Sequence, residues 1–413
     1  MIHLSRVLIF VTFLAVNVGL GLYVTARSIA PRRFDPPHAR RRLIALSIAA
    51  VLVVAALEML ARRLAPFGGG AWRPLVWVER VIGLTLMVTL PSLVVMHIFT
   101  PLAARVARLF RSAPHADEST AKHDSEAQSN RAEPTRREAV TRVISAGVAG
   151  VASGAVLHGA VFGRHDIEVT DVPVTIDGLA PSLDGLTIAQ ITDLHAGIFT
   201  GLAELERVVD RVNALRADVV VITGDVIDNN PSHIPDAMRL LGKLKGRLGV
   251  YAILGNHDLY TGAEAVRRGL AKAGLPCLVD RSVKIHTGDP RRGSITLAGV
   301  NDVMARDADG GGPDLVRALA GRDPDAPVVL LAHNPVFFEE SAGLVSLQLS
   351  GHTHGGQINV GGVASAMLPY VAGRYERARS TLYVSRGIGI TGAPVRLAAR
   401  PEITRVSLTA RRA

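Results

Sequence analysis

Two different patterns of apolar and polar residues divide the chain. Before about residue 112, long uncharged stretches are separated by arginine clusters, whereas after about residue 165 short apolar runs end in polar clusters. A membrane-spanning helix needs about 20 predominantly apolar residues. We therefore expect an N-terminal helical transmembrane region over residues 1–111, with helices at about 7–26, 43–61 and 81–104. The second helix requires that Glu58 lie at the membrane interface.

Two further segments separate this region from the C-terminal half. Residues 112–142 are polar and have no apolar periodicity, which predicts a disordered linker. This linker contains Arg136 and Arg137 in a sequence similar to a twin-arginine export signal, although Ala139 stands where a large apolar residue is usual. Residues 143–163 are uncharged and rich in glycine, and are predicted to form a fourth transmembrane helix, a helix-packing face or an export signal. No small-x-small cleavage site is evident, so we expect the segment to be retained as an anchor.

The distribution of arginines predicts a topology. Arginines are frequent between residues 27 and 42 and between residues 105 and 142, and fewer between residues 62 and 80. The positive-inside rule then places the first loop and the linker in the cytoplasm. If residues 143–163 cross the bilayer, the C-terminal half lies on the extracytoplasmic side of the cell membrane, which is the arrangement we favour. If residues 143–163 only lie on the membrane surface, the C-terminal half remains in the cytoplasm.

The C-terminal half shows short apolar runs that stop at clusters of Asp, Asn, His and Gly. Five such runs are Leu186–Ile191, Asp218–Ile222, Gly249–Leu254, Pro327–Leu331 and Val345–Leu349. Continuous apolar runs of this length are typical of strands buried on both faces. Apolar residues from Leu202 to Leu215 are spaced by three and four, which predicts a helix. Alternating strands and helices indicate a layered α/β domain over residues 165–413.

The polar clusters supply candidate metal ligands. In α/β sheets, ligands bind at the carboxyl ends of the strands, where all five clusters lie. Together they provide two carboxylates, one amide and four imidazoles: Asp193, His195, Asp225, Asn256, His333, His352 and His354. Nitrogen and oxygen donors without thiolate suit Mn, Fe or Zn ions. Seven donors exceed what one tetrahedral ion needs, but two ions sharing a carboxylate could use them all. The only cysteine, Cys277, excludes a multi-cysteine zinc site and is expected to be a buried apolar residue.

Each motif alone is weak, because Asp-x-His or Gly-Asp occurs more often in an ordinary turn, but the ordered set resembles a known superfamily. The motifs are Asp193-Leu-His195, Gly224-Asp225, Gly255-Asn256-His257-Asp258, His333 and Gly351-His352-Thr-His354. They are similar to those of the calcineurin-like metallophosphoesterases over residues 165–413. Gly355–Ile358 and Tyr383–Gly389 look like the membrane-associated bacterial branch.

The resemblance implies a four-layer α/β/β/α sandwich with a dinuclear metal site. By matching motif, one divalent ion is expected on Asp193, His195 and His354. The other is expected on Asn256, His333 and His352, and Asp225 would bridge the two. His257 would not bind metal but would face the leaving group, and Asp258 could orient it. Arg386 and Arg396 are candidates for contacts with the phosphate.

The implied activity is hydrolysis of phosphomonoesters or phosphodiesters by a hydroxide that bridges the two ions. His257 and Asp225 are the expected catalytic residues. The formal charge of +10 raises nucleic acid as a partner, but many arginines flank apolar stretches and aromatic residues are few. We therefore expect a membrane partner, no nucleic acid, and a phosphate-ester substrate that could be lipid-linked.

Two other classes of protein remain alternatives. The first is a catalytically silent metal-binding sensor or scaffold that retains the phosphoesterase fold, which a degenerate ligand set would favour; none of the expected ligands is missing. The second is a transporter with an appended domain. The apolar stretches carry few internal polar groups of the kind that mark a transport pathway, which argues against it. The sequence leaves open the natural substrate, the metals and the oligomeric state.

Overall fold

The computed structural model describes residues 150–151, 154–288, 293–307 and 311–411. The chain divides into two compact units, Met1–Leu157 and His158–Ala413. The transmembrane helices expected at residues 7–26, 43–61 and 81–104, and the linker at 112–142, lie outside the described residues, as does much of 143–163. Within the described part of the chain, no helix is long and apolar enough to cross a membrane.

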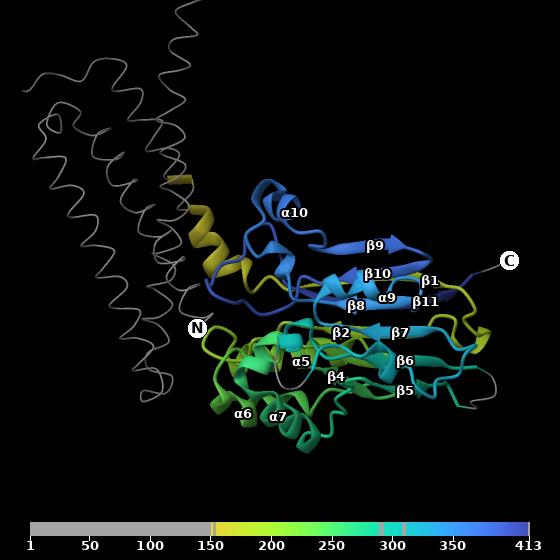
Figure 1. Cartoon of the computed structure of the whole chain (residues 1–413). Coiled ribbons are helices and arrows are strands. Elements are labelled where there is room, and N and C mark those ends of the chain that lie inside the picture. Colours follow the sequence, from red (N-terminus) through yellow and green to blue (C-terminus); the bar gives the residue numbers. More distant parts are fainter. Residues whose placement is uncertain (1–149, 152–153, 289–292, 308–310, 412–413) are drawn as a thin grey trace, which may run out of the picture. The chain divides into compact units, whose positions relative to one another are not determined.

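Two mixed β-sheets form the centre of the second unit (Figure 1). The first sheet has the order β1 (Glu168–Ile176), β11 (Glu402–Ala410), β2 (Thr187–Ile191), β3 (Val219–Thr223) and β4 (Val250–Ile253). The second has the order β5 (Arg281–Ile285), β6 (Ile295–Gly299), β7 (Val328–Leu331), β8 (Leu347–Ser350), β10 (Ser380–Val384) and β9 (Gly373–Arg377). Strands β2, β3 and β4 are parallel, as are β6, β7, β8 and β10, so their carboxyl ends point the same way within each sheet.

The inner faces of the two sheets share one hydrophobic core. Ile188 and Val221 of the first sheet belong to the same buried cluster as Leu331 and Leu349 of the second. Strands pleat, so alternate residues of β2 and β3 point the other way. There Ile191 and its neighbours pack against helices α5 (Leu202–Ala214), α6 (Ile234–Leu241) and α7 (Asn256–Lys272). This two-sided burial explains why the strands are apolar throughout.

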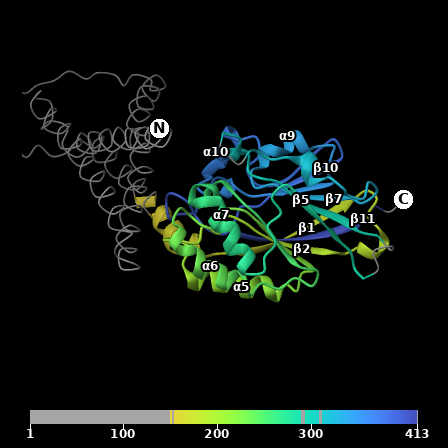
Figure 2. The ribbon, with the colours of Figure 1, turned by 60° about the horizontal axis from the view of Figure 1, so that its bottom comes forward.

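Short helices cover the outer face of the second sheet. Leu330 and Val300 pack there against Phe337, near α8 (Leu315–Ala318) and α9 (Phe338–Ser341). Figure 2 shows α5 and α6 on one side of the unit and α9 on the other. The remaining short helical segments are η3 (Gly159–Gly163), η4 (Pro181–Leu183), η5 (Pro231–His233), η7 (Val303–Asp307), η8 (Pro335–Phe337), η9 (His354–Gly356), η10 (Val360–Gly362) and α10 (Val363–Met367).

The α/β class expected from the sequence is confirmed. All five apolar runs form strands, within one or two residues of the expected bounds, and the periodic segment from Leu202 forms α5. β3 pairs with β2 and β4, and β7 pairs with β6 and β8, in chain order, whereas β2 also pairs antiparallel with β11. The parallel pair β1–β11, which joins Glu168–Ile176 to Glu402–Ala410, was not predicted.

Candidate metal centre

Seven side chains from five strand ends meet at one edge of the two sheets. β2 leads into Asp193 and His195, β3 into Asp225, β4 into Asn256, β7 into His333, and β8 into His352 and His354. All are buried except His352, which is partly exposed. The structure therefore brings together every metal ligand expected from the sequence.

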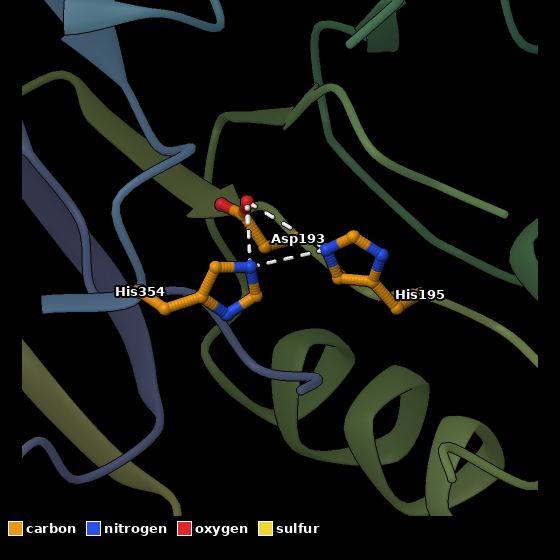
Figure 3. Close-up of side chains that lie close together, drawn as sticks. All are labelled: Asp193, His195 and His354. Carbon is orange, nitrogen blue, oxygen red and sulfur yellow. Dashed lines mark hydrogen bonds and ion pairs between the residues drawn. The ribbon is translucent and has the colours of Figure 1, made fainter. Parts of the chain in front are cut away.

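Asp193, His195 and His354 form a first cluster (Figure 3). The Nε2 atoms of the two histidines lie 3.1 Å apart. Asp193 Oδ1 lies 3.4 Å from His354 Nε2 and 4.0 Å from His195 Nε2. Ligands about 2.0–2.2 Å from one cation are themselves separated by roughly 3–4 Å, so these three atoms are spaced as ligands of a single ion would be.

Asp225, His333 and His352 form a second cluster, with Asn256 beside it. His352 Nδ1 lies 2.8 Å from Asn256 Oδ1. His333 Nδ1 donates a hydrogen bond to the carbonyl oxygen of Thr223 at 2.8 Å, which directs Nε2 toward Asp225. That Nε2 is buried and makes no hydrogen bond within the described residues. A buried nitrogen without a hydrogen bond is costly, and a cation would supply a contact beyond the ion pair with Asp225 Oδ2 at 3.2 Å.

Asp225 is shared by the two clusters. Its Oδ2 lies 3.5 Å from His195 Nε2 and 3.2 Å from His333 Nε2. Its Oδ1 accepts a hydrogen bond of 2.8 Å from the backbone N–H of His257, which fixes the carboxylate in this orientation. One carboxylate thus faces ligands of both clusters.

The backbone at the site is conformationally unusual. Five of the seven residues have a positive backbone φ: Asp193 at 53°, His195 at 44°, Asp225 at 51°, His352 at 72° and His354 at 52°. This left-handed region is uncommon for residues other than glycine and costs on the order of 1–3 kcal/mol per residue. Strain concentrated in this way is typical of functional sites, where the fold stabilises it elsewhere.

Two glycines allow the strand-end loops to approach each other. At Gly224, with φ 94°, a Cβ would lie 2.7 Å from His333 Nδ1. At Gly351, a Cβ would lie 2.2 Å from Asp193 Oδ2. Any larger residue at either position would displace a candidate ligand.

The charges of the site favour ionised carboxylates beside neutral His195 and His354, whereas Asp225 outweighs burial and raises the pKa of His333. Burial alone would raise the pKa of Asp225, but His333 and His195 hold that pKa well below its usual value. Burial lowers the pKa of His354 to about 3, against the opposing effect of Asp193. Burial lowers the pKa of His195 as well. Ionised carboxylate and neutral imidazole are the forms that bind metal, so the residues present fit divalent cations, and His333 would release its proton when a cation binds.

His257 lies beside this site and is oriented by Asp228. His257 Nδ1 donates a hydrogen bond to the backbone oxygen of Asp228 at 2.9 Å and lies 3.5 Å from Asp228 Oδ1. Burial lowers the pKa of His257, but Asp228 and Asp225 outweigh it and raise the pKa to about 9. Asp228 was not singled out from the sequence; its position three residues after Asp225, in the same strand-end loop, was the available signal.

The expectation that Asp258 orients His257 is wrong. Asp258 is fully buried and accepts hydrogen bonds of 3.0 Å from the backbone N–H groups of Val226, Ile227 and Gly255. Consecutive residues on a helix point about 100° apart, so Asp258 faces away from its neighbour. Its carboxyl group joins the loop after β3 to the first turn of α7.

The two arginines considered as phosphate contacts are engaged within the fold. Arg396 is 2% exposed, and its guanidinium donates hydrogen bonds to the carbonyl oxygens of Gly387, Gly389 and Ala399. Arg386 forms ion pairs with Glu168 and Glu402. An incoming phosphate would have to compete with both carboxylates for Arg386.

Comparison with known proteins identifies the family. The Calcineurin-like phosphoesterase family matches residues 186–356. Proteins named "Transmembrane protein with metallophosphoesterase domain" are 37% identical over 260 residues in Danio rerio and 40% identical over 253 residues in Bos taurus. These matches cover 61% and 59% of this chain, and 60% and 57% of those relatives.

A bacterial relative is matched almost completely. An uncharacterised metallophosphoesterase of Bacillus subtilis is 32% identical over 269 residues, which cover 62% of this chain and 92% of that protein. The vertebrate relatives are thus matched over little more than half of their length, and the bacterial relative over nearly all of it. On these matches, the chain belongs to the calcineurin-like phosphoesterase family, a family of metal-dependent hydrolases.

Proposed function

We propose that the chain is a membrane-anchored phosphoesterase that uses two divalent metal ions to hydrolyse phosphomonoester or phosphodiester bonds. The observation that carries the proposal is the position of Asp225, whose Oδ2 faces His195 of one ligand cluster and His333 of the other. A carboxylate between two buried nitrogen and oxygen ligand sets suits a pair of ions. The four-layer sandwich implied by the family is consistent with two sheets that share one core.

Each side chain has a distinct role in this proposal. Asp193, His195 and His354 would hold one ion, Asn256, His333 and His352 the other, and Asp225 both. When bound, the ions would activate a water molecule and neutralise the charge of the phosphate. Manganese, iron and zinc all suit this mixture of nitrogen and oxygen donors.

His257 would act on the leaving group rather than on a metal. Its Nδ1 is occupied by the backbone oxygen of Asp228, so Nε2 is the nitrogen available to a substrate. The ring lies edge-on to His195, with centroids 4.5 Å apart, which places it at the border of the first ligand cluster. A proton donated or shared from this position would stabilise charge on the departing oxygen.

The membrane part of the proposal rests on the sequence and on the names of relatives. The uncharged stretches at residues 7–26 and 81–104, and the stretch 43–61 with Glu58 at its end, have lengths typical of transmembrane helices. Two vertebrate relatives are named transmembrane proteins. We propose a multi-pass anchor with the catalytic domain on the extracytoplasmic side, and a substrate that is a lipid-linked or cell-envelope phosphate ester.

The full-length protein in detergent, loaded with Mn²⁺, should hydrolyse a chromogenic phosphomonoester or phosphodiester. The same preparation can then be assayed against extracted lipids, which identifies the substrate class. Turnover that disappears on chelation and returns with Mn²⁺ is the expected result. If metals bind but none of these esters is hydrolysed, the protein is instead a metal-binding scaffold.

A further inference from the structure

An uncharged segment projects from the domain directly after the loop that carries His352 and His354. From Gly355 through Gly373 the chain has no charged residue. Within it, Val360, Met367 and Leu368 are 60%, 77% and 44% exposed. Figure 1 shows α10, in the middle of this segment, standing out from the body of the domain. Single exposed apolar residues are ordinary, but several on one uncharged projection mark an interaction surface.

This projection is fixed to the metal site. Asn359 Oδ1 accepts a hydrogen bond of 3.1 Å from the backbone N–H of Ala364, at the start of α10. Gly361 and Gly362 have φ of 68° and 75°, a left-handed turn that glycine adopts without strain. Gly356 of η9 packs so closely that a Cβ there would lie 2.4 Å from the Ala364 side chain. The position of α10 is therefore set by the helical turn that contains His354.

Residues at the start of the domain extend the same surface. In η3, Val161 and Phe162 are 39% and 63% exposed. The carbonyl oxygen of Gly159 accepts a hydrogen bond of 3.2 Å from the backbone N–H of Arg396. The next residue, Leu397, pairs with Ile358 and accepts a bond of 2.9 Å from the backbone N–H of Asn359.

These contacts join η3, through residues 396–397, to the base of the projection. Both views show η3 and α10 at the same end of the domain (Figures 1 and 2). We name the exposed residues on these two elements the apolar rim: Val161, Phe162, Val360, Met367 and Leu368.

The chain itself indicates what covers the apolar rim. Residues 143–163 form one uncharged stretch, and its last residues are those of η3. A segment expected to anchor the protein in the membrane thus runs directly into the rim. This continuity favours a bilayer over a second copy or a soluble protein. Because α10 has only five residues, the rim can reach the interfacial layer but cannot cross the bilayer.

We infer that the apolar rim contacts the surface of the lipid bilayer and holds the metal site at the level of the lipid headgroups. The inference rests on the proposed membrane anchor and specifies which surface of the catalytic domain faces the lipid. It also favours phosphate esters embedded in the membrane over soluble ones as substrates.

The test uses the full-length protein reconstituted in phosphatidylcholine vesicles, in a Cys277→Ser background. Met367→Cys is labelled with an environment-sensitive fluorophore, and Val360→Cys provides a second site on the same projection. Val316→Cys is the matched control, because Val316 is apolar and 85% exposed but lies on α8, which packs on β5 at the far edge of the second sheet. Metal content of each variant reports whether the site has folded.

We expect blue-shifted emission and quenching by nitroxide-bearing lipid at positions 360 and 367, and neither at position 316. Emission at 360 and 367 that matches position 316 and responds only to an aqueous quencher would overturn the inference. A blue shift without quenching by the lipid would mean that protein covers the rim, which overturns it equally. A chain that does not float with the vesicles overturns the anchor and the inference together.

The fluorescence measurement does not depend on turnover. The membrane contact of the apolar rim and the proposed phosphoesterase activity can therefore be refuted separately. Quenched probes on a protein that hydrolyses no ester would retain the inference and overturn the enzymatic proposal. Unquenched probes on a vesicle-bound protein that hydrolyses esters would do the opposite.

Discussion

His195 Nε2 and His354 Nε2 lie 3.1 Å apart inside the fold, and Asp193 Oδ1 lies 3.4 Å from the second of them. Burial lowers the pKa of both histidines, so two protonated rings at this distance are excluded. The two nitrogens can share one proton, or both can face one cation. The adjacent carboxylate and the second ligand cluster favour a cation.

Asp225→Asn should lose metal and activity together. An amide in place of the carboxylate removes a negative charge that faces both ligand clusters. Elemental analysis of the purified variant should show less than the wild-type metal content, and ester hydrolysis should fall to background. Asp236→Asn, an exposed change on α6, is the control and should retain both. A fully loaded and active Asp225→Asn protein would rule out the bridging role.

His257→Ala should lower turnover strongly while the protein keeps its metal. A positioned acid contributes about 10²–10⁴-fold to the rate, so kcat should fall by a factor in this range. His165→Ala is the matched control, since His165 is partly exposed and pairs with Glu204 outside the metal clusters. Metal analysis that finds an emptied site in His257→Ala would show that this histidine is a ligand instead.

Asp228→Asn should lower kcat by roughly tenfold, a smaller loss than that of His257→Ala. The variant keeps the backbone oxygen that binds His257 Nδ1 but loses the carboxylate 3.5 Å away. Asp228 Oδ1 also lies 3.8 Å from His195 Nδ1, so the metal content of the variant is measured beside kcat. With the metal content unchanged, we expect Asp228 to act through His257, and the double variant should be no slower than His257→Ala alone. Independent, multiplicative losses in the double-mutant cycle would contradict this dependence.

Arg396→Met should destabilise the fold rather than weaken substrate binding. The change leaves the buried carbonyl oxygens of Gly387, Gly389 and Ala399 without their donor, at a cost of at least about 3 kcal/mol. The measurement is the free energy of unfolding in denaturant. Arg239→Met, at a 59% exposed side chain, should change it by less than about 0.5 kcal/mol. Unchanged stability with a raised KM would restore Arg396 as a phosphate contact.

Cys277 should be unreactive in the folded protein. The residue is partly buried rather than fully buried as expected. Burial still raises the pKa of its thiol to about 12, so little thiolate is present at pH 8. A chromogenic disulfide reagent should label it slowly in buffer and quickly in denaturant. Rapid labelling of the native protein would mean that the segment around Cys277 opens readily.

The sequence predicted that the candidate ligands lie together because each of them follows the end of a strand. Each of the five apolar runs ends in a polar cluster, and parallel strands place their carboxyl ends at one edge, so Asp193, Asp225 and His333 could be assigned to one site before any distance was known. The five strands and α5 were readable for the same reason, since two-sided burial demands continuous apolar runs.

Other features depend on geometry that local patterns do not encode. Asp228 and Asp258 both flank candidate site residues, and only the path of the chain after β3 and the rotation of α7 decide which one meets His257. The parallel pairing of β1 with β11 joins distant parts of the chain. Arg386 pairs with Glu168, which lies 218 residues earlier in the chain, so the sequence does not reveal this partner. Arg396 bonds to the backbone of the nearby Gly387, Gly389 and Ala399, but the fold of that loop is not encoded in any local residue pattern.

The most direct test of the central claim is a metal titration of the full-length protein after dialysis against a chelator. Hydrolysis of a chromogenic phosphate ester is measured as Mn²⁺ is added, and bound metal is determined at each point. The account predicts no turnover without metal and a rise that levels off as about two ions bind per chain. Turnover that survives chelation, or two bound ions with no hydrolysis of any ester, would contradict it.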